Sequence, residues 1–409
     1  MRPSSGSKAP PPRGPPDVTY LQLLRLPGVA RLAIASLLGR IPIVMVSLSY
    51  ILLLRALGRP FALAGAVAGT VAIAAGVAAI PQGRLVDRLG QTRVLIPLAL
   101  ANATAVLGVL LTARAGGPSW ALIALAALDG LTIPPVSASM RTLWPVITGG
   151  EHVETAFALE SVLQEGFYIA GPLLAGAIAA LASPDVALVT AVVLTVSGTL
   201  LFATSRASRA QRGGRSTAGR LGALASPGLR TLIVALLPAG IAFGALEVAT
   251  PAFAEDHGSR ATAGLLLALW GVGSMVGGLW YGRQRFTGPV ERRLLIVLAV
   301  MPLAMAPVAL ADSVASMGIL IAVAGVPIAP AFTVSYTLID RLAPEGATTE
   351  AFTATTTAIV AGVALGNAAG GALVGPLGTS LTFLLAAGVA ALCPLAVLLG
   401  RRTLVAVPA

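Results

Sequence analysis

Ionisable side chains inside long apolar stretches are the first candidates for chemistry in this sequence. They are Arg40, Asp129, Glu160, Glu165 and Glu247. Burying such a group in hydrocarbon costs about 2.5–3.5 kcal/mol on insertion scales, so these residues are rare without a functional reason. A carboxyl group kept from water holds its proton more readily than one in water, and it can then exchange protons. We expect Glu165 to carry a coupling proton, with Arg40 favouring its ionised form, and we rank Asp129 next.

Neutral polar residues share these stretches and could add hydrogen bonds to a mostly apolar cavity. They are Gln164, Tyr168, Tyr336 and Asn367. Two alternatives remain open at this point. The neutral residues could make ordinary bonds between helices, and Arg40 could form a buried pair with a carboxylate that serves packing only.

The elements that position these residues are membrane-spanning helices. Of the 409 residues, 56% are hydrophobic and only 11% are charged, whereas soluble domains carry about 25% charged residues. Apolar stretches of about 20 residues recur, which is long enough to cross a bilayer as helices that satisfy their own backbone hydrogen bonds. Twelve spans are predicted, near 31–54, 61–82, 94–113, 119–140, 156–181, 185–204, 229–254, 263–282, 294–311, 316–339, 350–374 and 379–399.

Charge predicts the orientation. With the N-terminus inside, the cytoplasmic segments hold 22 of the 27 Lys and Arg residues. Positive residues accumulate on the cytoplasmic side of membrane proteins. We therefore expect a multi-pass protein of the cell inner (plasma) membrane with both termini in the cytoplasm. The net charge of +11 marks that face and does not indicate nucleic-acid binding.

The chain repeats itself. Residues 130–177 align without a gap on 325–372, pairing Gly130 with Gly325 and Phe157 with Phe352. Both copies begin on the cytoplasmic side, which is the pattern of parallel six-helix repeats in transporters. We predict an all-α membrane protein with twelve transmembrane helices in two pseudo-symmetric halves. Its parts are a disordered cytoplasmic tail (1–24), an N-terminal half (25–204), a basic cytoplasmic linker (205–228) and a C-terminal half with a short tail (229–409).

The loop after the second span carries a recognisable pattern. The segment PQGRLVDRLGQTRVL, residues 81–95, resembles the signature between helices 2 and 3 of the major facilitator superfamily, through Gly83, Asp87, Arg88 and Gly90, with Arg93 one position late. The resemblance implies the twelve-helix major facilitator fold and a gating loop that locks the two halves together in an outward-open state. The second-half copy, 282–293, has no matching aspartate. The alternative is a solvated turn that only sets topology.

Small residues recur at a spacing of four and predict faces on which helices approach closely. Span 11 has Gly362, Gly366 and Gly370, and span 5 has GPLLAG at 171–176. In the family that the chain resembles, helices 2 and 11, and 5 and 8, meet between the halves, so we expect the glycines there. GPLLAG, through Gly171, Pro172 and Gly176, also resembles an antiporter motif of drug–proton exchangers. The arginine expected in helix 4 is missing.

These features favour a secondary active transporter over an enzyme. The sequence has no P-loop, no H-E-x-x-H and no aspartate cluster for magnesium, and we expect no cofactor and no metal. We predict alternating access with proton-coupled efflux of small amphiphilic molecules or drugs, and an importer or uniporter of a polar or anionic metabolite as the alternative. A channel and a transport-dead sensor are other possibilities. The expected partners are a small-molecule substrate, protons and the lipid bilayer, with no nucleic acid, and the chain is expected to work as a monomer.

Overall fold

A computed structural model describes residues 20–150, 152–214, 219–257, 262–284, 286 and 288–405. Within these ranges the regular elements are helices and no strand occurs. Most of the tail expected at 1–24 lies outside the described residues.

The first half of the chain contains six candidate membrane spans. They are α2 (Val29–Ala56), α3 (Phe61–Leu89), α4 (Gln91–Arg114), α5 (Ser119–Thr132) continued by α6 (Val136–Ile147), α7 (Val153–Leu181) and α8 (Pro184–Ala203). Ser183 begins α8 by accepting a hydrogen bond from the backbone of Val186, with Pro184 at the first helical position. Serine caps and first-turn prolines are typical helix starts because that turn has unpaired N–H groups.

The second half contains the remaining five of the eleven helices that are long and apolar enough to span. They are α10 (Pro227–Asp256), α11 (Thr262–Tyr281), α12 (Val290–Met305) continued by η2 (Ala306–Leu310), α13 (Val314–Gly325) continued by α14 (Ile328–Leu342), and α15 (Thr348–Ala390) continued by α16 (Leu392–Leu404). The last stretch has 57 residues, about 85 Å of helix, far more than one crossing needs. Gly378, with φ at 76°, breaks the helix there, so this stretch supplies two crossings and the twelve expected spans are accounted for.

The fourth span is longer than predicted. It was expected to end near 140, but α6 continues to Ile147 after a break at Ile133–Pro135. Prolines interrupt the backbone hydrogen bonding of a helix. The second half has a break two residues earlier in the alignment, at Val326 and Pro327 between α13 and α14. Arg141 therefore lies in a helix and not in the predicted loop, and it is 3% exposed.

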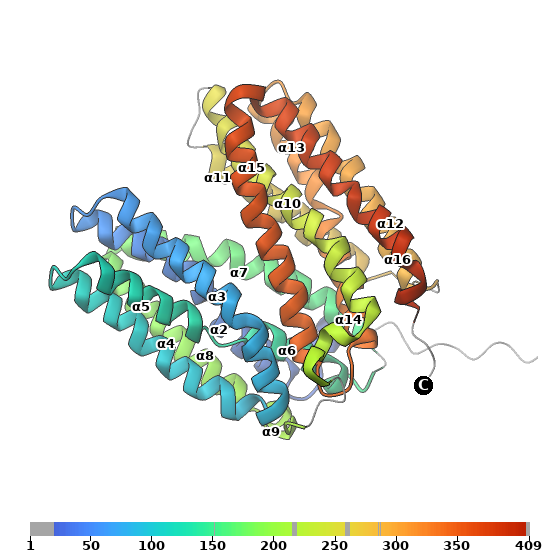
Figure 1. The fold of residues 1–409 in the computed structure, drawn as a ribbon, viewed down its shortest axis with the longest axis horizontal. Coiled ribbons are helices and arrows are strands. Elements are labelled where there is room, and N and C mark those ends of the chain that lie inside the picture. Colours follow the sequence, from blue (N-terminus) through green and yellow to red (C-terminus); the bar gives the residue numbers. More distant parts are fainter. Residues whose placement is uncertain are drawn as a thin grey trace, which may run out of the picture.

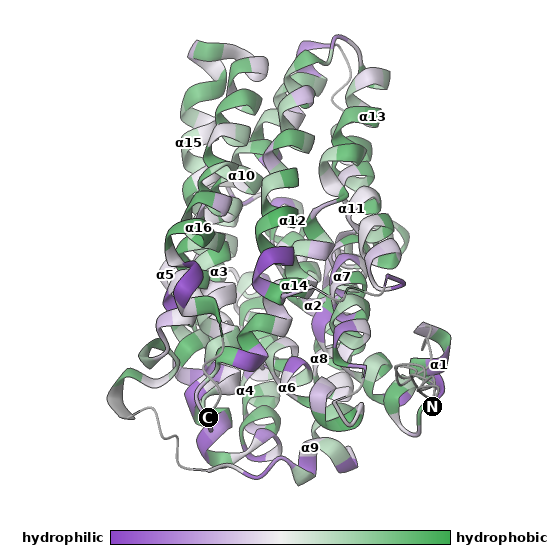
Figure 2. Ribbon diagram, turned by 90° about the vertical axis from the view of Figure 1, so that its right-hand side faces the viewer, coloured by the Kyte–Doolittle hydropathy of each residue, from purple (hydrophilic) through white to green (hydrophobic). Residues whose placement is uncertain are grey.

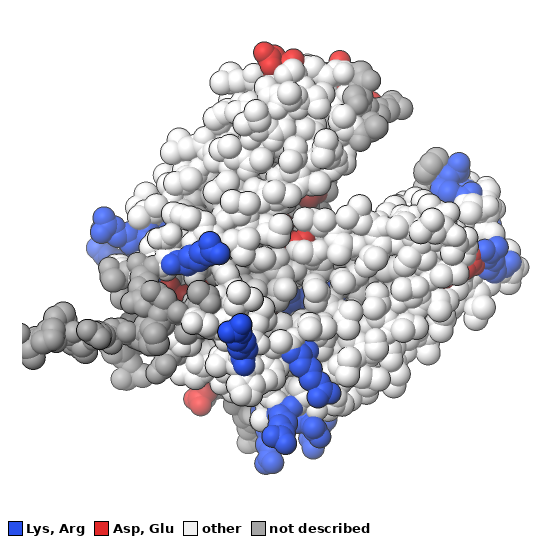
Figure 3. Space-filling model, turned by 180° about the vertical axis from the view of Figure 1, so that it is seen from behind, with Lys and Arg blue, Asp and Glu red and all other residues white. Residues whose placement is uncertain are grey.

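The spans form two lobes that meet at one end (Figure 1). One lobe contains α2 to α8 and the other α10 to α16. Apolar residues cover most of the helix length (Figure 2). One hydrophobic core lies wholly within the first lobe, and the other joins residues of both lobes, such as Phe157 and Phe352. We call the end that holds Asp87 and Glu350 the closed end. A hollow separates the lobes toward the opposite, open end, with acidic atoms at its base (Figure 3).

Three short segments accompany the spans. These are α1 (Tyr20–Arg25), α9 (Arg206–Ala210) and η1 (Gly219–Ala225). The hydroxyl of Tyr20 donates to the backbone oxygen of Gly278 over 2.8 Å and thereby ties α1 to the second lobe. Burial raises the pKa of Tyr20 to about 12, so this hydroxyl keeps its proton and remains a donor at physiological pH.

Candidate functional site

Asp87 joins the two lobes. Its carboxylate accepts hydrogen bonds from the backbone N–H groups of Thr349 (3.1 Å) and Glu350 (2.9 Å). These residues open α15, where unpaired N–H groups and the helix dipole favour a negative charge. The aspartate predicted from the loop pattern therefore holds the start of a helix in the opposite half.

The neighbours of Asp87 strengthen this contact. Arg84 Nε lies 2.9 Å from Glu350 Oε1. A Cβ added to Gly83 would lie 2.5 Å from Thr353 Oγ1 and 3.0 Å from Glu350 Cα. Only glycine therefore allows α3 and α15 to approach so closely. Sequence reasoning did not single out Arg84 or Glu350.

The other signature residues have different surroundings. Arg88 and Arg93 are exposed. Gly90 turns the chain between α3 and α4 with φ at 87°, a left-handed conformation that suits glycine. The backbone N–H of Gly214, in the linker, donates to the backbone oxygen of Asp87 over 3.0 Å.

A second contact replaces the aspartate that the second-half copy lacks. Arg293 of α12 donates to both carboxylate oxygens of Glu154 at the start of α7, each over 2.6 Å. A Cβ on Gly282 would lie 2.7 Å from Ala158 Cβ, much as Gly83 meets Thr353. Sequence reasoning missed this pair, although the repeat aligns Glu154 with Thr349, the partner of Asp87. Both halves thus contribute a close helix contact at the closed end.

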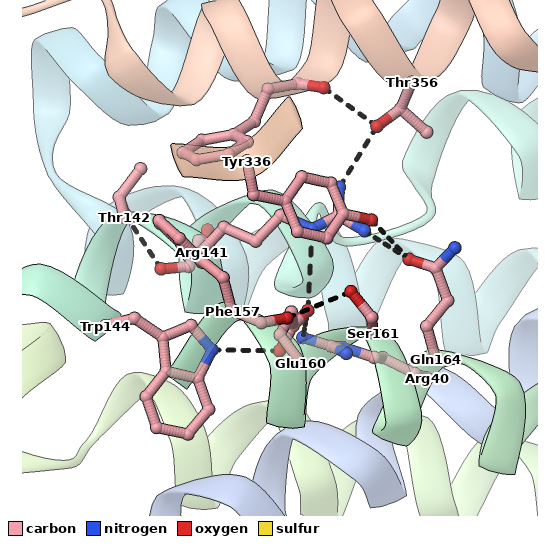
Figure 4. A network of polar contacts seen from close by, with 12 residues as sticks. Arg40, Arg141, Thr142, Trp144, Phe157, Glu160, Ser161, Gln164, Tyr336 and Thr356 are labelled. Carbon is pink, nitrogen blue, oxygen red and sulfur yellow. Dashed lines mark hydrogen bonds and ion pairs between the residues drawn. The ribbon is translucent and has the colours of Figure 1, made fainter. Parts of the chain in front are cut away.

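A cluster of polar side chains is buried where α2, α6 and α7 of the first lobe meet α14 and α15 of the second (Figure 4). Arg40 donates to Glu160 Oε1 over 2.7 Å, and the Trp144 indole donates to Glu160 Oε2 over 3.0 Å. Arg40 and Glu160 are 1% and 0% exposed. The expectation that Arg40 acts on Glu165 is wrong, because the ion-pair partner of Arg40 is Glu160.

Arg141 completes this cluster and extends it to the second lobe. Its Nε lies 3.5 Å from Glu160, its Nη2 donates to Gln164 over 2.6 Å and its Nη1 donates to Thr356 of α15 over 3.1 Å. The guanidinium carbon is 4.3 Å from the ring centre of Tyr336, whose hydroxyl also donates to Gln164, over 2.8 Å. Sequence reasoning counted Arg141 among the loop arginines. The signal available in the sequence was the pair Pro134–Pro135. Prolines at this point indicate a break inside the span, after which a second helical segment, α6, continues it.

Glu165 lies at the contact between α7 and α11. Twelve residues into α7, it is about 18 Å along the helix from the closed end. Its carboxylate accepts a hydrogen bond over 2.9 Å from the hydroxyl of Ser274, which belongs to the other lobe. The side chain is partly exposed, and Tyr168, three residues on, is 50% exposed. Ser274 was not among the predicted residues; the glycine-rich face of α11 was the only hint of a close contact.

Glu247 and Asn367 are further polar residues inside the spans, from α10 and α15, and Asn367 lies near the Glu247 carboxylate. Glu247 is exposed, and Tyr168 lies within the electrostatic range of both Glu165 and Glu247. Polar groups of both lobes therefore converge near Tyr168.

Asp129 lies apart from these residues. Its carboxylate accepts hydrogen bonds from Tyr50 (2.9 Å) and Asn102 (2.7 Å), both in the first lobe, and it is 2% exposed. A buried carboxylate with two donors is well satisfied. This geometry agrees better with bonding between α2, α4 and α5 than with a place in the hollow.

The predicted glycine faces pack mostly inside each lobe. A Cβ on Gly362 or Gly366 would lie 2.5 Å or 2.0 Å from a backbone oxygen of α10, and Gly370 also meets α10. Gly171 packs against α2, and nothing lies within 4 Å of a Cβ on Gly176. The expectation that these glycines line the contact between lobes is therefore wrong, although α3 does meet α15 and α7 does meet α11. Pro172 lies inside α7.

No group of three or more His, Cys, Asp or Glu side chains that could hold a metal ion occurs within the described part of the chain. The chemistry that this site offers is proton exchange at carboxyl groups, hydrogen bonding and charge recognition by arginine.

Comparison with known proteins assigns the class. The family model of the Major Facilitator Superfamily matches residues 32–361 and 232–406. The chain belongs to this superfamily, and the eleven long apolar helices make it a multi-pass membrane protein. Family and fold point to a transporter rather than an enzyme.

Individual relatives are more distant. The uncharacterized MFS-type transporter y4rN of Sinorhizobium fredii is 27% identical over 312 residues, which cover 72% of this chain and 75% of that protein. The human organic anion transporter MFSD10 has the same fold, with a TM-score of 0.71, 15% identity and coverage of 90% and 99% of the two chains. A bacterial homologue of the iron transporter ferroportin in an outward-facing state gives a TM-score of 0.72, 17% identity and coverage of 91% and 99%.

Proposed function

We propose that this chain is a proton-coupled transporter that works by alternating access and that the structure represents its outward-facing state. The contacts of Asp87, Glu154 and Glu350 join the lobes at the closed end, and the hollow lies on the other side (Figure 3). Arginines of the loops at the closed end support its assignment to the cytoplasm. We place both termini there and the protein in the plasma membrane. The outward-facing state of the ferroportin homologue agrees with this assignment.

The observation that carries proton coupling is the bond between Glu165 and Ser274. An ionised Glu165 accepts this hydrogen bond with a full negative charge, and such bonds are about twice as strong as neutral ones. Protonation weakens the bond and removes a charge from the contact between α7 and α11. Proton binding and separation of the lobes thereby become energetically linked.

Other residues take secondary roles in this proposal. We place Glu247, Asn367 and Tyr168 on the path to Glu165, because Glu247 and Tyr168 are exposed and Glu247 offers a second carboxyl group. Efflux of small amphiphilic molecules is the direction that the GPLLAG motif favours, because this motif resembles that of drug–proton exchangers. Import or uniport of a polar or anionic metabolite is the alternative. We also propose that a single chain suffices for transport.

Reconstitution tests this function. Liposomes with an entrapped pH-sensitive dye would be given an imposed pH gradient and a panel of cationic, anionic and neutral aromatic compounds. We expect the flux of at least one compound to be coupled to proton flux in the wild type. Glu165→Gln, which mimics the protonated form, should abolish accumulation driven by the gradient while exchange at equilibrium persists.

Asp129→Asn is the matched comparison, because Asp129 is also a carboxylate inside a membrane-spanning helix but contacts only the first lobe. This variant should still accumulate substrate when a pH gradient is imposed. Gradient-driven accumulation at the wild-type rate by Glu165→Gln would contradict the assignment of the proton to this residue. Loss of the response in Asp129→Asn alone would transfer the assignment to Asp129.

A further inference from the structure

The buried cluster in Figure 4 holds more positive than negative charge. Arg40, Arg141 and Glu160 are 1%, 3% and 0% exposed. Glu160 forms the short ion pair with Arg40 and accepts the indole hydrogen of Trp144, so its oxygens are largely used. Two guanidinium groups thus share one carboxylate, which leaves one positive charge. The effective cost of taking an ion out of water is several kcal/mol unless a counter-charge is present.

The excess charge is located on Arg141. Its hydrogen bonds go to two neutral acceptors, the amide oxygen of Gln164 and the hydroxyl of Thr356, and its Nε has no hydrogen-bond acceptor. Neutral acceptors compensate a guanidinium less well than a carboxylate does. Arg141 is therefore a buried donor whose present partners can be replaced by an anion.

The cluster also lies next to accessible side chains at the contact between the lobes. Thr356 is exposed and Gln164 is partly exposed, although Arg141 beneath them is not. The ring of Tyr336 packs against the Arg141 guanidinium, with 4.3 Å between the ring centre and the guanidinium carbon, and keeps the guanidinium plane in a fixed orientation. An anionic group that reaches Thr356 and Gln164 thus comes within reach of the Arg141 N–H groups with little movement of the protein.

We propose that Arg141 recognises a carboxylate or phosphate group of the transported molecule. This inference rests on the proposed transport function and names its substrate class, an organic anion. Both oxygens of such a group can bind the planar guanidinium fork, which a lysine cannot reproduce. The bound anion replaces Gln164 and Thr356 as acceptor and cancels the excess charge of the cluster.

Recognition at this position also affects both lobes. Arg141 belongs to the first lobe, whereas Thr356 and Tyr336 belong to the second. An anion that takes the place of Thr356 removes one bond between the lobes. Substrate binding would thereby weaken the contact between the lobes at this position.

The test is ligand binding by the purified full-length chain in nanodiscs at one fixed pH, measured as thermal stabilisation. The probes are 2-naphthoate, its neutral amide 2-naphthamide, the cation 2-naphthylmethylammonium and inorganic phosphate. We expect naphthoate to stabilise the wild type in preference to the amide and the cation. Stabilisation by phosphate would assign the site to phosphate groups as well. Arg141→Gln should weaken naphthoate binding about tenfold to a hundredfold, since bonds to charged groups are lost, and Arg141→Lys should retain part of it.

Two further variants separate recognition from folding. Gln164→Glu adds a carboxylate at an acceptor 2.6 Å from Arg141; it should raise the melting temperature of the empty protein yet abolish naphthoate binding. Damage to the structure would instead lower both the melting temperature and the naphthoate binding. Arg114→Gln, at an exposed ion pair with Asp185, is the matched control and should bind naphthoate as the wild type does.

The proposal fails if naphthoate and naphthamide stabilise the wild type equally, or if the preference for naphthoate survives in Arg141→Gln. These measurements involve no proton gradient. Their failure therefore contradicts the substrate class and leaves proton coupling to be judged by Glu165→Gln, whereas normal anion binding without proton-driven flux contradicts only the proposed function.

Discussion

Asp87 and Glu350 belong to opposite halves of the chain, and the backbone N–H of Glu350 donates to the Asp87 carboxylate over 2.9 Å. Glu350 in turn pairs through its side chain with Arg84, on the same helix as Asp87. One residue of the second half is thus held twice by α3. The bonds involve charged groups at a helix start, so they contribute most while the lobes touch and nothing once they separate.

Asp87→Asn should weaken this contact without unfolding the protein. The amide keeps one acceptor but loses the charge that the start of α15 favours, a loss of about 1–2 kcal/mol, or roughly five- to thirtyfold in the equilibrium between states. The shift in this equilibrium can be measured by labelling of Val360→Cys in a background without Cys393. Val360 lies on the exposed face of α15 that also carries Thr356. We expect the Asp87→Asn variant to be labelled more slowly from the outside. The control is Asp185→Asn, in an exposed pair at the open end; labelling rates that match between Asp87→Asn and this control would leave the loop with a topological role only.

Gly83→Ala should have a similar effect through shape. The added methyl group would lie 2.5 Å from Thr353 Oγ1, so α3 and α15 must move apart. We expect slower outside labelling of Val360→Cys and reduced flux. Gly76→Ala, in the same helix with nothing within 4 Å of the new Cβ, should behave as the wild type. Equal behaviour of the two alanine variants would refute the requirement for close approach.

Gly366→Ala should reduce the stability of the protein and leave the equilibrium between its outward-facing and inward-facing states unchanged. Its Cβ would lie 2.0 Å from the backbone oxygen of Ile241, inside the second lobe. Overpacking of this kind costs about 1–3 kcal/mol, which a lower melting temperature in detergent would report. Gly371→Ala, in the same helix and facing open space, should melt at or above the wild-type temperature. If Gly366→Ala instead changes labelling at normal stability, the glycine acts between the lobes after all.

The orientation can be tested with reporters. A reporter fused after Arg402 should be cytoplasmic, because α16 ends beside the start of α10, where Thr231 and Thr403 hydroxyls lie 2.8 Å apart. A tag inserted at Gly116, in the turn between α4 and α5, should be external. The reverse result would invert the assignment of the closed end to the cytoplasm and the outward-facing state with it.

Much of the fold could be predicted from the sequence. The bilayer requires apolar stretches of defined length and turns between them, so the twelve crossings and the repeat of six follow from hydropathy and the gapless alignment of residues 130–177 with 325–372. Asp87 could be singled out for a similar reason. It lies at the end of α3, just before the turn at Gly90, and the residue types and spacing of its motif are visible in one stretch of sequence.

The partners of the buried residues were decided by tertiary structure. Arg40 could have met Glu160 or Glu165, which lie five residues apart in α7 and so face different directions. Its choice of Glu160 depends on how α2 and α7 are rotated about their axes. Likewise, Gly362 and Gly366 meet α10 rather than the other lobe, although their spacing suits either neighbour. Hydropathy cannot resolve these rotations because each span is apolar nearly all around. Arg141 shows the limit most clearly, since only the extension of α6 and the arrival of Thr356 from α15 turn an apparent loop arginine into a buried charge at the contact between the lobes.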